Sequence, residues 1–137
     1  MKQEDKELLL KDLCARLPYG VKVESVFINP DTKEHKSCGI EVFDATSILM
    51  IRDGLGEFKP YLFPLSSMTE EQYKYISYNF GRDGLDYIKY GTCDFHSSTL
   101  NIEDIYELVD WLHKNHFDYR GLISMGLAND ASGLNIY

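Results

Sequence analysis

The sequence has no long hydrophobic run. Its longest strongly apolar run, residues 48–51, has four residues, whereas a membrane-spanning helix needs about 20. The first apolar run, residues 8–10, has three, and the apolar region of a secretory signal needs about 7–15. We therefore expect a cytoplasmic chain that does not contact a membrane.

Cysteine is scarce and its positions form no recognisable pattern. Cys14, Cys38 and Cys93 are the three cysteines, and none belongs to a CxxC pair. An odd count without paired spacing argues against a disulfide framework, so we expect reduced thiols. Cys14 falls on the apolar side of an expected helix, which predicts a buried structural thiol.

The established catalytic and cofactor motifs are also missing. Gly54-x-Gly56 lacks the third glycine of a dinucleotide-binding loop, and there is no GxxxxGK[ST], HExxH or GxSxG sequence. The sequence therefore predicts no catalytic residues and no cofactor.

Acidic residues and tyrosines are abundant instead. The formal net charge is −8, from 22 acidic and 14 basic residues, and such a surface repels phosphate backbones. Generic nucleic-acid binding is thus disfavoured. Aromatic residues make up 13% of the chain, including 10 tyrosines, and tyrosine suits both protein interfaces and the stacking of bases.

Helical patterns occupy four regions. Residues 3–17 form an amphipathic helix in our prediction. A second helix begins at a capping box, formed either by Thr69 with Gln72 or by Ser67 with Glu70, and runs to about residue 80, where Gly81 ends it. Asn101 caps a third helix to about residue 115, with Ile102, Ile105, Val109 and Leu112 as its buried stripe. A short helical stretch is expected at residues 122–127.

Strand patterns fill the remaining segments. We expect strands at residues 21–28, 35–43, 46–52, 57–63 and 85–95, with Pro60 at an edge or bulge because it cannot donate to a ladder. These elements predict one domain, residues 1–137, of the α+β class. Its architecture would be a small bent antiparallel sheet or partly open barrel, with an N-terminal helix and two to three further helices.

Basic residues beside aromatic residues suggest one kind of binding site. Arginine or lysine can hold a phosphate while an aromatic ring stacks on a base. The residues that would form this nucleotide-type pocket are Arg52, Lys59, Arg82, Lys89, Arg120, Tyr61, Tyr87, Tyr90 and Tyr119. The alternative is ordinary charge pairing with acidic neighbours.

A second kind of site would be a docking surface for a basic partner. Glu103, Glu107 and Asp110 lie on an acidic face of the helix that follows Asn101. Tyr75 and Tyr78 lie off the apolar face of the preceding helix and could anchor a partner. The alternative is a face that simply contacts solvent.

Histidine patterns give weaker hypotheses. His113-x-x-His116 and Cys93-x-x-His96 have spacings that zinc ligands can use, but nothing in the sequence brings the two pairs together, so we predict no metal site. Asp110, His113 and His116 could serve a small hydrolase only if they converge in one pocket. Histidines near a helix C-terminus more commonly complement its dipole.

Three blocks carry a resemblance: residues 8–20 (LLLKDLCARLPYG), 59–72 (KPYLFPLSSMTEEQ) and 115–137 (NHFDYRGLISMGLANDASGLNIY). Together they resemble a family of small uncharacterised proteins of bacteriophages and mobile elements of Bacteroides-type gut bacteria. The resemblance implies no activity and no catalytic residues. It implies the cytoplasm of a bacterial host cell as the setting, and interference with host defence as the role.

The resulting expectation is a non-enzymatic binding protein. It would bind a host protein or sequester a nucleotide-type signal. The alternatives are a small hydrolase-type enzyme and a structural or assembly protein that homo-oligomerises.

Overall fold

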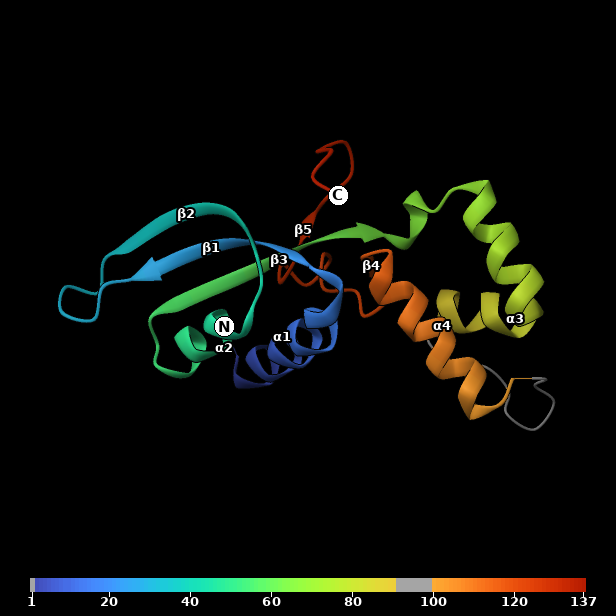
Figure 1. Cartoon of the computed structure of the whole chain (residues 1–137), viewed down its shortest axis with the longest axis horizontal. Coiled ribbons are helices and arrows are strands. Elements are labelled where there is room, and N and C mark those ends of the chain that lie inside the picture. Colours follow the sequence, from blue (N-terminus) through green and yellow to red (C-terminus); the bar gives the residue numbers. More distant parts are fainter. Residues whose placement is uncertain (1, 91–99) are drawn as a thin grey trace. The chain divides into compact units, whose positions relative to one another are not determined.

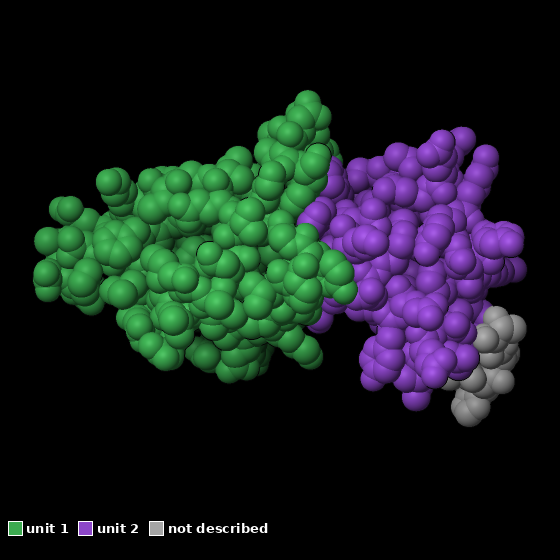
Figure 2. Space-filling model, in the orientation of Figure 1, with its two compact units in different colours: residues 1–62, 122–137 green, residues 63–121 purple. Residues whose placement is uncertain are grey.

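The computed structural model describes residues 2–90 and 100–137. The chain divides into two compact units (Figure 2): unit 1 comprises Met1–Leu62 and Leu122–Tyr137, and unit 2 comprises Phe63–Gly121. The described residues form four α-helices and a five-stranded mixed sheet that does not close into a barrel, and an N-terminal helix comes first. The predicted α+β class is confirmed. No helix among the described residues combines the length and the apolar character needed to cross a membrane.

Unit 1 is a sheet with two helices packed on it (Figure 1). Its elements are α1 (Gln3–Arg16), the 3₁₀ turn Leu17–Tyr19, β1 (Lys22–Ile28), β2 (His35–Val42), α2 (Ala45–Arg52), the first part of β3 (Gly56–Pro64) and β5 (Asn129–Asp130). The strand order is β2-β1-β3, all antiparallel, and β5 pairs in parallel with Tyr61 and Leu62 of β3. The strands predicted at residues 21–28 and 35–43 are confirmed as β1 and β2, which pair with each other.

The core of unit 1 lies between this sheet and the two helices. Leu13 of α1 packs with Val23 of β1, Phe58 of β3 and Phe43, and the rings of Phe43 and Phe58 meet edge-on with centroids 5.7 Å apart. Leu122 and Leu127 close the core from the C-terminal segment. Residues 122–126 form turns, so the predicted helix at 122–127 is wrong. Their leucines are buried, but Gly126 has a φ of +75°, outside the range of a right-handed helix.

The phase of α1 differs from its prediction. Asp12 and Arg16 are fully buried, whereas Cys14 is exposed. The Nε of Arg16 donates to Oδ2 of Asp12 at 2.7 Å, one helical turn away. A carboxylate and a guanidinium that neutralise each other can be buried together. The expected buried thiol at Cys14 is therefore wrong, because this ion pair occupies the inward side of the helix.

The predicted strand at residues 46–52 is the helix α2. Its N-cap is Asp44, whose carboxylate accepts from the backbone N–H of Ser47 at 3.0 Å. The hydroxyl of Ser47 accepts in turn from the Asp44 N–H at 3.2 Å. This reciprocal capping box satisfies two of the N–H groups that a helix start leaves unbonded, and it overrides the strand preference of the Ile- and Leu-rich sequence.

Pro60 lies at a position where β3 is paired with a described strand on one side only. It is paired with Val23 of β1. On the opposite edge, pairing of β3 with another described strand begins only at Tyr61. This arrangement agrees with the expected edge position, since proline lacks the N–H that a doubly paired strand requires.

Unit 2 is mainly helical. It contains the end of β3, the 3₁₀ turn Leu65–Ser67, α3 (Glu70–Tyr90), α4 (Ile102–Lys114) and β4 (Phe117–Asp118), which pairs in parallel with Phe63 and Pro64. Of the two predicted capping boxes, the one formed by Thr69 with Gln72 is confirmed: Gln72 Oε1 accepts from the Thr69 N–H at 2.8 Å, and Thr69 Oγ1 accepts from the Gln72 N–H at 3.2 Å.

The helix α3 is interrupted at Gly81. This residue has φ +64° and ψ −163°, a conformation that is essentially restricted to glycine. The predicted helix end at Gly81 is thus a break, after which the chain becomes helical again up to Tyr90. The predicted strand at 85–95 is wrong for residues 85–90, and the rest of it lies outside the described residues.

Aromatic rings dominate the core of unit 2. Trp111 stacks between Tyr75 and Phe117, with centroid distances of 5.3 and 5.7 Å and interplanar angles of 14° and 22°. Phe63 contacts Phe117 at 6.3 Å, and Phe80 contacts Tyr75 at 6.5 Å. This aromatic stack lies against Ile76, Ile88, Leu108 and Leu112, which are buried.

Candidate binding surfaces

The helix α4 begins with a complete cap. Asn101 Oδ1 accepts from the Asp104 N–H at 2.9 Å, and Asp104 Oδ2 accepts from the Asn101 N–H at 3.1 Å. Glu103 and Asp104 lie in the first turn, and His113 and Lys114 lie in the last. These charges complement the helix dipole at both ends. These interactions stabilise α4 at both ends, and the helix holds its exposed side chains in fixed positions along its surface.

The buried side of α4 matches the predicted stripe at Leu112 but not at Ile102. Leu108, Leu112 and His113 are buried, whereas Ile102 is 70% exposed and Ile105 and Val109 are half-buried. The prediction that Ile102 belongs to a buried stripe is wrong. The aromatic stack requires Trp111 to face Tyr75 and Phe117, and this contact sets the rotation of the helix about its axis.

As a result, α4 exposes a second apolar line to solvent. Ile102 and Tyr106, one helical turn apart, are 70% and 72% exposed, and Val109 continues the line on the same side. Exposed carboxylates flank it. We call this region the α4 surface and define it as Ile102, Glu103, Tyr106, Glu107, Val109, Asp110 and His113.

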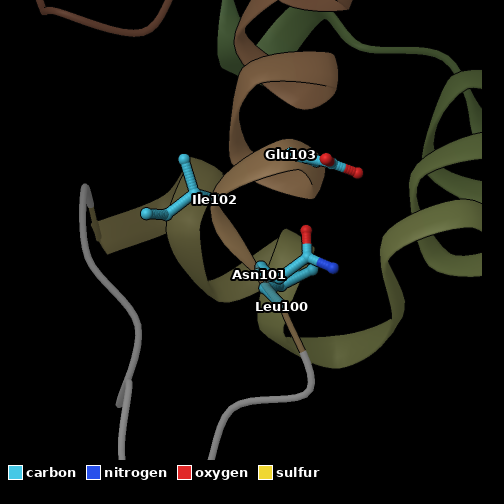
Figure 3. A pocket seen from close by; sticks show the side chains of 4 residues that line it. All are labelled: Leu100, Asn101, Ile102 and Glu103. Carbon is cyan, nitrogen blue, oxygen red and sulfur yellow. The ribbon is translucent and has the colours of Figure 1, made fainter.

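Two shallow hollows lie on the α4 surface and beside it. One is lined by Leu100, Asn101, Ile102 and Glu103, and Figure 3 shows the Ile102 and Glu103 side chains projecting in different directions from the start of the helix. The other is lined by Tyr106, Glu107, Val109, Asp110 and His113. Neither lining includes a lysine or an arginine. Each hollow combines apolar side chains with at least one carboxylate, together with Asn101 in the first and His113 in the second.

Tyr119 fixes the C-terminal end of the α4 surface. Its hydroxyl lies 2.7 Å from His113 Nε2, and its ring lies 5.3 Å from the imidazole. The guanidinium carbon of Arg120 lies 5.0 Å from the centre of the Tyr119 ring, within the range of a cation–π contact. The imidazole of His113 is therefore held in one orientation at the edge of the hollow.

The residues of the hypothesised nucleotide pocket are spread over both units. Arg52, Lys59 and Tyr61 belong to unit 1, and the other six belong to unit 2. Tyr61 is buried in β3. Exposed Arg52 donates to the carboxylate of Asp53 through Nε at 2.9 Å and Nη2 at 3.2 Å, and this pairing lowers the pKa of Asp53 and raises that of Arg52. The ordinary charge pairing weighed as the alternative is thus present at Arg52.

Of the six residues in unit 2, Tyr87 and Tyr119 pack against the buried core of that unit. Arg82, Tyr87, Lys89 and Tyr90 follow the break in α3, and the Lys89 ammonium lies 5.3 Å from the centre of the Tyr90 ring. Tyr119 and Arg120 contact each other. None of the six lines either hollow described above.

The residues of the hypothesised docking surface are distributed differently. Glu103, Glu107 and Asp110 belong to the α4 surface. Tyr75 is 44% exposed but stacks on Trp111, so one face of its ring is used in the core. Tyr78, which is 91% exposed, projects from α3. The sequence prediction missed Ile102 and Tyr106 as exposed groups. Their i, i+4 spacing places them on one side of the helix, but it does not tell whether that side is buried or exposed.

Metal and catalytic hypotheses receive no geometric support from the described residues. Within residues 2–90 and 100–137, no three His, Cys, Asp or Glu side chains are grouped as a metal site would require. The Cys93-x-x-His96 pair lies outside the described residues. His113 is buried and bonded to Tyr119, and His116 follows α4 with a φ of +60°.

Comparison of the chain with protein-family models, with curated proteins and with solved structures found no match. Proposals about function therefore depend on the residues themselves.

Proposed function

We propose that the protein is a non-enzymatic binding protein that docks a basic, amphipathic segment of a partner protein on its α4 surface. The observation that carries this proposal is the exposure of Ile102 and Tyr106 on one side of α4, with Glu103, Glu107 and Asp110 beside them. An apolar line beside a charged row is what an amphipathic helix of opposite charge recognises.

The apolar and the acidic groups of the α4 surface would contribute to binding in different ways. Tyrosine and isoleucine supply apolar area, and tyrosine is among the residues that contribute most to binding at the centre of interfaces. The carboxylates accelerate encounter with a basic partner and select against acidic ones. In the setting that the phage-family resemblance implies, the partner would be a host protein.

A protein partner fits this surface better than a nucleotide does. A phosphate would meet carboxylates in the hollow lined by Glu107 and Asp110, and like charges disfavour the contact. The basic and aromatic residues proposed for a nucleotide pocket lie outside both hollows. Sequestration of a nucleotide is therefore the alternative function, and it is tested alongside peptide binding.

The test uses two peptides with the same apolar face, one with lysines and one with glutamates on the polar face. Fluorescence anisotropy should show binding of the basic peptide, weakened by salt as screening predicts. Tyr106→Ala should weaken binding at least tenfold, as loss of a central aromatic anchor does. Tyr78→Ala is the matched control, since it removes a tyrosine that is even more exposed, from α3.

Three results would overturn the proposal. Equal affinity for the two peptides would show that charge complementarity does not contribute to binding. Equal effects of Tyr106→Ala and Tyr78→Ala would show that the peptide does not bind at the α4 surface. A thermal-shift panel of mononucleotides and cyclic nucleotides supplies the third. A ligand at 100 times its Kd adds about 2.7 kcal/mol of stability, so a selective rise in Tm with one nucleotide would favour the alternative function.

A further inference from the structure

The strand β2 forms one edge of the unit 1 sheet, and every residue in it is exposed. It is eight residues long, and no strand among the described residues pairs with its outer side. An edge of this length offers a row of backbone donors and acceptors to another strand. Ile40 and Val42 are 47% and 51% exposed and add apolar area to it.

A bulge gives this edge an unusual spacing. The pairing of β1 with β2 shifts register between Ser25 and Val26, so that β2 contains one extra residue at Cys38–Gly39. Gly39 has a φ of +79°, which glycine adopts without steric cost. On either side of this point the two strands pair regularly.

The ladder shows which residues of β2 direct their backbone groups outward. At one end the Phe43 N–H donates to Val21, and at the other the Glu34 carbonyl accepts from Asn29, both at 2.9 Å. Antiparallel pairs alternate between bonded and non-bonded positions. Counting inward from these two bonds, the outward-directed residues are His35, Ser37, Ile40 and Val42.

The spacing of these outward-directed residues determines which kind of strand can pair with the outer side of β2. A regular strand presents outward groups every second residue, but Ser37 and Ile40 are three apart. A regular partner that pairs correctly at Ser37 is therefore out of register at Ile40. A second copy of β2 carries the same extra residue, and in antiparallel pairing about a two-fold axis its Ile40 faces Ser37 and its Val42 faces His35.

The same register places opposite charges together. Lys36 is paired with Phe27 and Glu41 with Val23, so Lys36 and Glu41 lie on the same face of the sheet in spite of the bulge. Across the two-fold axis Lys36 of one copy faces Glu41 of the other, and this happens twice. Opposite charges directly across an antiparallel pair are stabilising, and like charges are destabilising.

From these three features we infer that the protein forms a two-fold symmetric dimer in which the β2 edges of two copies pair, with Lys36 of each chain opposite Glu41 of the other. This inference is independent of the proposed docking on α4, which lies in the other unit.

The first experiment measures dimerisation by analytical ultracentrifugation. The unmodified chain should dimerise, and Lys36→Glu should weaken the homodimer by about tenfold, because both attractive pairs become repulsive. Glu41→Lys should do the same. An equimolar mixture of the two variants restores both charge pairs, so it should form a heterodimer as tight as the unmodified homodimer.

The second experiment fixes the register. In a background in which Cys14, Cys38 and Cys93 are serine, Lys36→Cys chains mixed with Glu41→Cys chains should form a disulfide-linked heterodimer on oxidation. Facing residues at a non-bonded antiparallel position have Cα atoms about 4.5 Å apart, within the range that a disulfide spans. Lys36→Cys chains alone should remain unlinked.

Several outcomes would overturn the inference. One is a chain that stays monomeric at millimolar concentration, and another is a dimer unaffected by Lys36→Glu. Because the Glu41 carboxylate accepts from the Ser25 hydroxyl at 2.9 Å, Glu41→Lys could lower stability by itself. Circular dichroism shows whether the Glu41→Lys variant is folded. If it is unfolded, the disulfide experiment decides the register, provided that the cysteine variants have the circular dichroism spectrum of the unmodified chain.

Discussion

The two units of this protein stabilise their cores by different means. Unit 1 packs mainly aliphatic side chains between a sheet and two helices and buries the Asp12–Arg16 ion pair. Unit 2 packs helices around stacked rings, with Trp111 between Tyr75 and Phe117. One short chain thus stabilises two cores in different ways. The stability of unit 1 depends on a buried pair of charges, and that of unit 2 depends on how its aromatic rings fit together.

The units also differ in how the chain builds them. Unit 1 joins segments from both ends of the sequence, whereas unit 2 is one continuous stretch. Contacts between distant segments form more slowly than local contacts, because closing long loops costs entropy. The single tryptophan, Trp111, lies in unit 2. Its fluorescence therefore reports on unit 2, while circular dichroism reports on the whole chain.

The largest effect is expected from Asp12→Ala in unit 1. The substitution leaves the buried Arg16 guanidinium without its carboxylate, and breaking a buried ion pair in this way costs about 3–5 kcal/mol. Urea unfolding followed by circular dichroism measures the loss. If the two units unfold independently, the Trp111 transition will stay in place while the dichroism transition becomes biphasic.

The control for this variant is the double substitution Asp12→Leu with Arg16→Met. It removes both charges and keeps apolar volume, which is often neutral for buried ion pairs. A double variant as unstable as Asp12→Ala would show that the two residues act through contacts other than their ion pair.

The next effect is expected from Gly84→Ala in unit 2. A Cβ at this position would lie 2.3 Å from the Cβ of Phe80, which belongs to the buried core of the unit. Overpacking of this kind costs about 1–3 kcal/mol. The Trp111 transition should move to lower urea concentration. An unchanged midpoint would contradict the close approach of the two helical segments at Gly84 and Phe80.

A smaller effect is expected from Tyr137→Phe in unit 1. The Tyr137 hydroxyl donates to the Tyr61 carbonyl and accepts from the Lys22 N–H, both at 2.8 Å, and the Lys22 ammonium bonds the Ile136 carbonyl. Removing the hydroxyl should cost about 1–2 kcal/mol. The matched control is Tyr78→Phe, which removes a hydroxyl that is exposed on α3.

Tyr137 also predicts a dependence on pH. Burial raises the pKa of its phenol from 10.0 to about 12, against the lowering effects of the Lys22 bond and of Arg16. The folded state therefore holds the phenolic proton more tightly than the unfolded state does. The stabilisation is complete below pH 10 and decreases as the pH rises from 10 to about 12. The difference in stability between the unmodified chain and Tyr137→Phe should shrink over this interval, and a constant difference would contradict the pKa shift.

The smallest effect is expected from Thr69→Ala in unit 2. This change removes the hydroxyl that accepts from the Gln72 N–H, and loss of such a cap costs about 1 kcal/mol. The shift should appear in the Trp111 transition. Restoration by Thr69→Ser, which keeps the hydroxyl, would separate capping from packing.

Local signals in the sequence predicted the elements that depend on local chemistry. The caps at Thr69 and Asn101 locate the starts of α3 and α4, and alternating residues locate β1 and β2. The helix α2 is not predicted because its Ile- and Leu-rich sequence favours a strand, and its Asp44–Ser47 cap is the only local signal for a helix start. The segment after Gly81 was missed because a glycine that ends a helix and one that interrupts it look the same in sequence.

Features that depend on tertiary packing could not be predicted. A charged pair at i, i+4 on α1 is usually exposed, and nothing local reveals that Asp12 and Arg16 are buried. The rotation of α4 depends on where Trp111 finds Tyr75 and Phe117. For this reason the acidic half of the α4 surface could be predicted, whereas its apolar half, Ile102 and Tyr106, could not.

The bulge at Cys38–Gly39 has a consequence for protein quality control in the cell. Exposed regular edges recruit strands from unfolded chains and grow into aggregates. An edge whose outward groups are spaced by three residues at its centre pairs poorly with any regular strand, so the extra residue in β2 protects the folded chain. Two-fold pairing of matched edges occupies both of them, and such an assembly stops at two copies instead of extending into a fibre.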